Sequence, residues 1–220
     1  MKKISIVFIT LIAVILLPLQ AFACACCAEP GTYFIRTSKP EDFVLEILSG
    51  IKFDDAAYLY MTEAGFDGIK GLDGIAKDYD SNDWTASPEF FSLTNGFASK
   101  TWKFNFKTKT GKIGTLVLPM PLQMLQFKAD IHDGKTGGGG GPLLYKEWRF
   151  KGNVQTGNGF FASGIVKPTT YFLVLQGRGN GCDNVEDFTH WRLEINGKRA
   201  DYAYFGELSS GSSYDEDDNQ

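Results

Sequence analysis

The residues best suited to chemistry are four cysteines, three of which form a cluster near the start of the chain. The cluster contains Cys24, Cys26 and Cys27, whereas Cys182 lies far along the sequence. In an oxidising compartment, Cys182 can form an intramolecular disulfide only with a member of this cluster. The chain-entropy model assigns about 5 kcal/mol of stabilisation to closing such a long loop. We therefore predict a structural disulfide between Cys182 and one of Cys24, Cys26 and Cys27.

The cysteine cluster also supports a second hypothesis, in which its thiolates hold a soft metal ion. Cys24 and Cys27 have Cys-x-x-Cys spacing with Cys26 between them, and thiolates this close together suit Cu(I) or Zn²⁺. No histidine directly follows Cys27, so the usual motif for covalent haem attachment is absent. Cys24, Cys26 and Cys27 are therefore an alternative soft-metal site.

A second set of residues has the spacing of a calcium-binding loop. Counted from Asp78 as position 1, oxygen ligands fall at position 3 (Asp80), position 5 (Asn82) and position 12 (Glu89). Alternate side chains can converge on one ion, and the late glutamate can close the site with both oxygens. Asp83 occupies the position where glycine normally makes the sharp turn, so a solvated surface loop is the competing interpretation. Calcium is the single candidate cofactor, and we otherwise expect none.

The remaining candidates for catalysis carry little signal. Two histidines, His132 and His190, fall on the polar sides of alternating segments, and no nucleophile-elbow motif is present. The glycine-rich stretch 177–181 lacks the spacing of a dinucleotide fingerprint, and the stretch 137–141 lacks the lysine of a P-loop. We interpret both stretches as flexible loops. These observations favour a non-catalytic protein and leave an unrecognised hydrolase as an alternative.

Composition and charge exclude one broad class of function. The 220 residues are 43% hydrophobic and 14% aromatic, which is enough apolar material for a packed core. The chain has 22 Lys+Arg against 26 Asp+Glu, a formal net charge of −4. A chain with a net negative charge is not a nucleic-acid binder of the usual kind. We therefore expect no nucleic-acid partner.

Residues 1–23 have the pattern of a secretory signal peptide. Two lysines precede an apolar run over 4–19, and Ala21-Phe22-Ala23 supplies the small residues that a signal peptidase requires. The apolar run is shorter than the roughly 20 residues that a membrane-spanning helix needs. We expect cleavage after Ala23, export to the periplasm or the extracellular space, and no transmembrane anchor after processing. A lipid-anchored start at Cys24 and an uncleaved anchor are the alternatives.

The elements that must position these residues are mainly β-strands. Large apolar residues alternate with polar ones in several short segments, and the stretch 169–176 is almost continuously apolar. The residues expected to face inward are Trp102, Phe104 and Phe106; Phe127, Ala129 and Ile131; Trp148 and Phe150; and Trp191, Leu193 and Ile195. We expect Asn196-Gly197 to supply the two positive-φ residues of a tight hairpin that returns over 199–205.

One helix and one turn-rich segment interrupt the strands. The stretch 38–41 begins with serine and ends with glutamate, which is capping-box spacing, and we predict a helix after it that ends at Gly50. A strand over 43–53 is the alternative. Residues that share one face of this helix are Phe43, Val44, Ile47 and Leu48. Glycine at every third position over 65–76 predicts a compact, turn-rich or 3₁₀ segment.

We therefore predict one mainly β globular domain over 24–206, built as a β-sandwich with one or two short helices. A β-barrel is the alternative architecture. An acidic tail over 207–220 is expected to be disordered. The function that best fits is an exported, non-catalytic β-domain that binds a ligand such as carbohydrate at its surface. Thiolate metal handling and an extracytoplasmic hydrolase are the alternatives.

Overall fold

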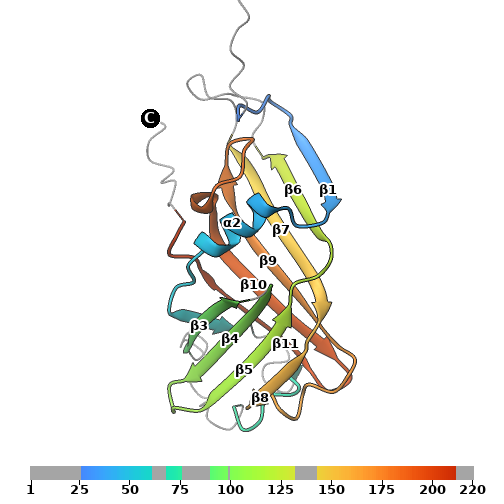
Figure 1. The fold of residues 1–220 in the computed structure, drawn as a ribbon. Coiled ribbons are helices and arrows are strands. Elements are labelled where there is room, and N and C mark those ends of the chain that lie inside the picture. Colours follow the sequence, from blue (N-terminus) through green and yellow to red (C-terminus); the bar gives the residue numbers. More distant parts are fainter. Residues whose placement is uncertain (1–25, 61–67, 76–89, 99, 132–142, 212–220) are drawn as a thin grey trace, which may run out of the picture.

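The computed structural model describes residues 26–60, 68–75, 90–98 (backbone only), 100–131 and 143–211 (Figure 1). The described residues contain eleven β-strands, one α-helix and one short 3₁₀ helix. In chain order these are β1 (Tyr33–Ser38), α2 (Asp42–Gly50), β2 (Ala56–Leu59), β3 (Phe90–Ala98), β4 (Thr101–Thr108), β5 (Ile113–Pro119), β6 (Met124–Asp130), β7 (Leu144–Asn153), β8 (Thr156–Gly159), β9 (Thr169–Gly179), η3 (Val185–Asp187), β10 (Phe188–Gly197) and β11 (Asp201–Glu207).

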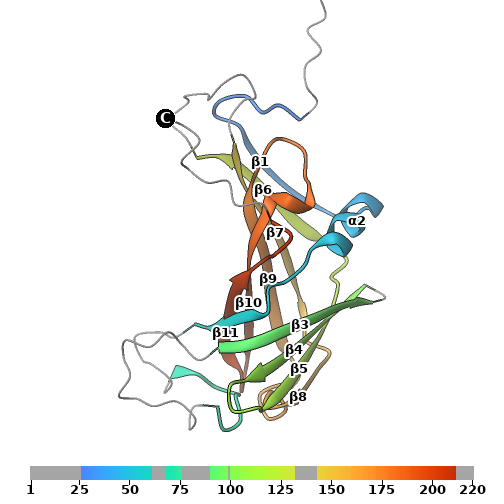
Figure 2. The ribbon, with the colours of Figure 1, turned by 90° about the vertical axis from the view of Figure 1, so that its left-hand side faces the viewer.

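The strands form two packed layers, as predicted for a β-sandwich. The hydrogen-bonded order is β1-β6-β7-β9-β10-β11-β2-β3-β4-β5-β8, and every pair is antiparallel. The larger layer consists of β1, β6, β7, β9, β10 and β11, and the smaller layer consists of β3, β4, β5 and β8. The short strand β2 links the two layers, and the smaller layer lies across one face of the larger one (Figures 1 and 2). The outermost strands β1 and β8 stay at opposite ends of this order, so the alternative of a closed barrel is wrong.

Aromatic side chains fill the space between the layers. Trp102, Phe104 and Phe106 of β4 are almost fully buried, as their alternation predicts. Their rings meet rings of the larger layer: the centroids of Phe106 and Tyr204 are 4.5 Å apart, and those of Phe104 and Trp191 are 5.9 Å apart. Each such side chain contributes about 1.5–3 kcal/mol on burial, so this aromatic layer holds the sandwich together.

Helix α2 lies on the same side of the larger layer as β4 and β5 (Figure 2). Its buried residues are Val44, Ile47 and Leu48, so the predicted helix is confirmed and the alternative strand is wrong. The capping-box prediction is wrong, because the N-cap is Glu41 and Ser38 still belongs to β1. Phe43 is 47% exposed, since the helix packs through a narrower stripe than its apolar residues suggest.

The inward face of β6 is the opposite of the predicted one. Met124 and Gln126 are buried, whereas Phe127 is half-buried on the outer face and Ile131 lies 49% exposed beyond the strand. The alternation of polar and apolar residues along a strand does not identify the inner face when a charged side chain on that face has buried partners. Lys128 finds such partners, because it forms an ion pair with Asp183 on the inner face.

The hairpin between β10 and β11 also differs from its prediction. Asn196 pairs with Asp201, and the Gly197 N–H donates to the Ala200 carbonyl over 2.7 Å, so the turn residues are Lys198 and Arg199, two positions later than predicted. Neither Asn196 nor Gly197 has a positive φ. Gly197 is required for a different reason: a Cβ there would lie 2.8 Å from the Thr169 Oγ1.

The folded part of the chain extends further than the predicted boundary at residue 206. Glu207 ends β11, and Leu208 is buried with its N–H donating to the Thr189 carbonyl over 2.8 Å. The Gly211 N–H in turn donates to the Leu208 carbonyl. The first five residues of the predicted tail, 207–211, therefore belong to the domain. The acidic composition of the segment gave no indication that Leu208 is buried in the core.

The described part of the glycine repeat, 68–75, is turn-rich, as expected for it. Lys70 forms an isolated bridge with Asp201, and Gly71 and Gly74 have φ angles of 86° and 72°, which glycine adopts without strain. The predicted signal peptide, His132 and the glycine stretch 137–141 lie outside the described residues. Among the residues that are described, no helix is long and apolar enough to cross a membrane.

Burial of four tyrosines predicts a loss of stability at alkaline pH. Burial raises the pKa values of Tyr171, Tyr202 and Tyr204 above the ordinary value of 10.0, and burial together with Glu147 raises that of Tyr145. The neutral phenol is favoured in the folded state, so stability is complete below the ordinary pKa and falls once the unfolded chain ionises above about pH 10. Chemical denaturation between neutral pH and about pH 11, with phenolate absorbance, measures this. Titration of all nine tyrosines near pH 10 without loss of stability would contradict it.

Candidate functional site

The outer face of the larger layer presents a row of polar side chains on β10. Because successive residues of a strand point to opposite faces, His190, Arg192 and Glu194 face outward while Trp191 and Leu193 are buried between the layers. The register places Gln176 of β9 beside His190 and Phe205 of β11 beside Arg192. Polar and aromatic groups from three adjacent strands are thus brought together.

These side chains line a groove of about 660 Å³, which we call the β10–β11 groove. It lies over β9, β10 and β11 and is bordered by the end of β2 and by Gly68 and Ile69 of the turn-rich segment. The side chains important for the argument are Tyr60, Gln176, His190, Arg192, Glu194 and Phe205. The groove combines hydrogen-bonding groups with exposed ring surface, which is the usual composition of a ligand site.

Aromatic rings form one side of the β10–β11 groove. Phe205 is 41% exposed and stacks on Tyr58 of β2, with ring centroids 5.4 Å apart and an angle of 22° between the planes. Tyr60 is 56% exposed, and its N–H donates to the Ala203 carbonyl of β11 over 2.8 Å. The backbone therefore holds two accessible rings, Tyr60 and Phe205, beside the groove.

Charged and amide groups form the rest of the groove. The Arg192 Nε lies 3.0 Å from the Glu194 Oε1, and the two side chains are 47% and 35% exposed. An ion pair this open contributes little to stability. Its remaining donors and acceptors stay available to a ligand, as do the imidazole of His190, whose Nδ1 contacts the Thr189 Oγ1, and the amide of Gln176.

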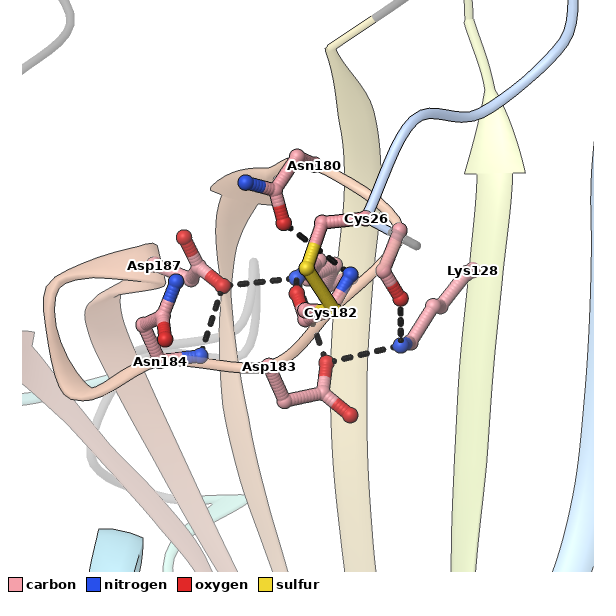
Figure 3. The surroundings of a disulfide bond; sticks show 9 residues. Cys26, Lys128, Asn180, Cys182, Asp183, Asn184 and Asp187 are labelled. Carbon is pink, nitrogen blue, oxygen red and sulfur yellow. Dashed lines mark hydrogen bonds and ion pairs between the residues drawn. A yellow bond between two sulfur atoms is a disulfide. The ribbon is translucent and has the colours of Figure 1, made fainter. Parts of the chain in front are cut away.

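The cysteines predicted to bond lie at the other end of the molecule. Cys26 and Cys182 form a disulfide that spans 156 residues, and the Gly181 N–H donates to the Cys26 carbonyl over 2.6 Å (Figure 3). The bond attaches the start of the described chain to the segment after β9. The sulfur of Cys26 is therefore not available as a thiolate ligand in this oxidised form, while Cys27 is exposed and Cys24 lies outside the described residues.

A buried group of charges, which we call the lysine–aspartate cluster, lies beside the disulfide. It consists of Lys128 on β6, Lys146 on β7, and Asp183 and Asp187 on the segment between β9 and β10. The Lys146 Nζ lies 2.6 Å from the Asp187 Oδ2 and 3.2 Å from the Asp183 Oδ1, and it also donates to the Cys182 carbonyl. The Lys128 Nζ lies 2.9 Å from the same Asp183 oxygen, and 2.7 Å from the Gly181 carbonyl.

Two glycines allow this cluster to form. Gly177 and Gly179 belong to β9, so the prediction of a flexible loop over 177–181 is wrong for this part. A Cβ at Gly177 would overlap the Asp187 backbone, and one at Gly179 would overlap the Asp187 carboxylate. The glycines are needed because the segment carrying Asp187 lies directly against the strand.

The metal-site predictions receive no support from the described residues. In the part of the chain that the structure describes, no group of three or more His, Cys, Asp or Glu side chains could hold an ion. The predicted calcium ligands lie outside that part; they are Asp78, Asp80, Asn82 and Glu89. Of the residues that line the groove, His190 was among the candidates from the sequence, whereas Tyr60, Arg192 and Phe205 were not. Arg192 and Phe205 could have been found from the alternation on β10 and β11, because they occupy the positions between the buried residues.

Comparison with known proteins assigns neither a family nor a function to this chain. The chain matches no protein-family model, no curated protein and no solved structure.

Proposed function

We propose that this protein is an exported, non-catalytic β-domain that binds carbohydrate in the β10–β11 groove. The observation that carries the proposal is the pair of accessible rings, Tyr60 and Phe205, beside a groove lined by hydrogen-bonding side chains. The groove offers partners for both parts of a sugar, the apolar C–H face and the polar rim.

A pyranose ring is apolar on its C–H faces and polar around its rim. The flat rings of Tyr60 and Phe205 offer an apolar surface for the C–H face. Glu194 accepts hydrogen bonds, Arg192 donates them, and Gln176 does both, which suits the hydroxyl groups around the rim. The groove volume of about 660 Å³ falls within the range of about 300–1,000 Å³ that is typical of small-ligand sites.

Two features support the exported state of this binder. Residues 1–23 carry the pattern of a signal peptide. The Cys26–Cys182 disulfide, in turn, is a bond that persists in oxidising compartments and is rare in the cytosol.

Substitution of the two rings tests the proposal. We expect Phe205→Ala and Tyr60→Ala each to weaken binding of the best-bound oligosaccharide about tenfold, equal to about 1.4 kcal/mol, because each removes a stacking surface. The measurement is a glycan-array screen of the wild-type protein followed by calorimetric titration of each variant. The matched control is Tyr33→Ala, since Tyr33 is 66% exposed on β1 at the far end of the larger layer.

Three outcomes would contradict the proposal. The first is the absence of binding across cell-wall and storage glycans. The second is equal weakening by Tyr33→Ala, which would show adhesion to exposed aromatics in general. The third is release of new reducing ends from a bound polysaccharide, which would make the protein a hydrolase.

A further inference from the structure

The lysine–aspartate cluster contains the groups needed for an intramolecular amide bond. The side chain of Lys146 is completely buried, and those of Asp183 and Asp187 are 5% and 3% exposed. The indole of Trp148 and the ring of Phe188, both buried and with centroids 4.7 Å apart, follow Lys146 and Asp187 closely in sequence. A primary amine and two carboxyl groups are thus enclosed together in the interior of the domain.

We propose that the Lys146 Nζ condenses with the Asp187 carboxyl group to form an isopeptide cross-link, with Asp183 as the proton carrier. The reacting groups are already in contact, because the Nζ lies 2.6 Å from the Asp187 Oδ2. This inference concerns the far end of the fold and is independent of carbohydrate binding in the β10–β11 groove.

The first step is a proton transfer within the buried pair. The Lys146 Nζ donates a hydrogen bond to the Asp187 Oδ2 over 2.6 Å, and this bond is the path for the proton. The proton passes from the Lys146 Nζ to Asp187. The Nζ lone pair is then a nucleophile, and the neutral Asp187 carboxyl group is an electrophile.

Asp183 acts on the attacking nitrogen. Its Oδ1 lies 2.9 Å from the Lys128 Nζ (Figure 3). The same oxygen lies 3.2 Å from the Lys146 Nζ. As the bond from Nζ to the Asp187 Cγ forms, Asp183 accepts a proton from the nitrogen, which makes Asp183 a general base.

A backbone donor holds the oxygen that leaves. The Asn184 N–H donates to the Asp187 Oδ2 over 2.9 Å, and this is the oxygen that accepts the proton from the Lys146 Nζ (Figure 3). In the intermediate Oδ2 is therefore a hydroxyl group, and Oδ1 carries the negative charge. Asp183 then returns its proton to Oδ2, the Cγ–Oδ2 bond breaks and Oδ2 leaves as water, while Oδ1 becomes the amide oxygen. One amine and one carboxylic acid become one amide and one water, with no oxidant or reductant involved.

The contacts around Asp187 hold its carboxyl group in place for this reaction. The missing Cβ of Gly179 lets the carboxyl group lie against β9, and the capping box with Asn184 fixes its orientation. The cross-link would connect β7 to the η3 segment, next to the disulfide that connects the same segment to the N-terminal part of the domain.

The test is the mass of the full chain recovered from cells, denatured, reduced and alkylated so that disulfides make no contribution. We expect a mass lower than that of the processed sequence by one water, and a branched peptide joining Lys146 to Asp187 after proteolysis. Wild-type protein that is folded by circular dichroism and has the full unmodified mass would overturn the proposal.

Two variants separate this reaction from other dehydrations. Lys146→Arg keeps the charge but cannot form the amide, and we expect it to have the full mass. Loss of water that persists in Lys146→Arg would indicate a succinimide elsewhere and would overturn the proposal. Asp187→Asn offers an amide as the electrophile, so we expect loss of one ammonia in place of one water; loss of water from this variant counts against Asp187.

The role of Asp183 has its own readout. We expect Asp183→Asn to form the cross-link at least tenfold more slowly in its folded fraction, equal to about 1.4 kcal/mol, as followed by mass after refolding. An unchanged rate would remove Asp183 from the reaction.

Discussion

Replacement of both Cys26 and Cys182 by serine is expected to lower the free energy of unfolding by about 5 kcal/mol. The disulfide spans 156 residues, so its loss frees almost the whole domain in the unfolded state. A domain typically has a total stability of only about 5–15 kcal/mol, so the variant should be close to unfolding at physiological temperature. Urea denaturation of the wild type and the double variant, both at neutral pH, measures the difference.

The double substitution is the informative form of this experiment. Cys182→Ser alone leaves Cys26 beside Cys24 and Cys27, where exchange among neighbours would complicate the result. Wild-type protein treated with a reductant provides the second comparison and should show a similar loss. A change well below 2 kcal/mol, the lower end of the typical range of about 2–5 kcal/mol for native disulfides, would show that the unfolded chain is restrained by other means.

Asp183→Ala is expected to lower the free energy of unfolding by about 3–5 kcal/mol. The Asp183 side chain is 5% exposed and forms ion pairs with both Lys128 and Lys146. Before condensation, its removal leaves two buried cations with a single buried carboxylate, Asp187; in the cross-linked chain it leaves Lys128 as the unpaired cation. An uncompensated buried charge is costly, because neither water nor a counter-ion replaces the lost partner. Thermal and urea denaturation of the variant measure the effect.

A double variant distinguishes charge imbalance from lost packing. Lys128→Met combined with Asp183→Ala removes one cation and one anion, and leaves Lys146 and Asp187 balanced, either as an ion pair or as the neutral amide. We expect the double variant to be more stable than Asp183→Ala alone, because the remaining buried charges balance. If Lys128→Met does not raise the free energy of unfolding of the Asp183→Ala variant, the effect of Asp183→Ala comes from lost contacts and not from the unpaired charge.

Local patterns in the sequence were sufficient to predict several of the strands, such as β4, β9 and β10, and a disulfide to Cys182. Trp102, Phe104 and Phe106 alternate with polar residues, and a pleated strand must place them on one face, whatever the remaining topology. Cys182 had only the N-terminal cluster as a partner. These conclusions depend on covalent order and short-range geometry, which any folded state of the chain must respect.

The tertiary structure decided where the polar groups meet. Which cysteine bonds to Cys182, and which face of β6 is inside, both depend on the segment after β9, which brings Asp183 to Lys128. The β10–β11 groove depends on strand order, because β2 pairs with β11 and so brings Tyr60 to Phe205 and Arg192. Pairing between distant strands is set by the balance of burial over the whole domain and not by any local pattern. The sequence alone therefore determined that this is a disulfide-bonded β-domain, and only the fold determined which side chains form its sites.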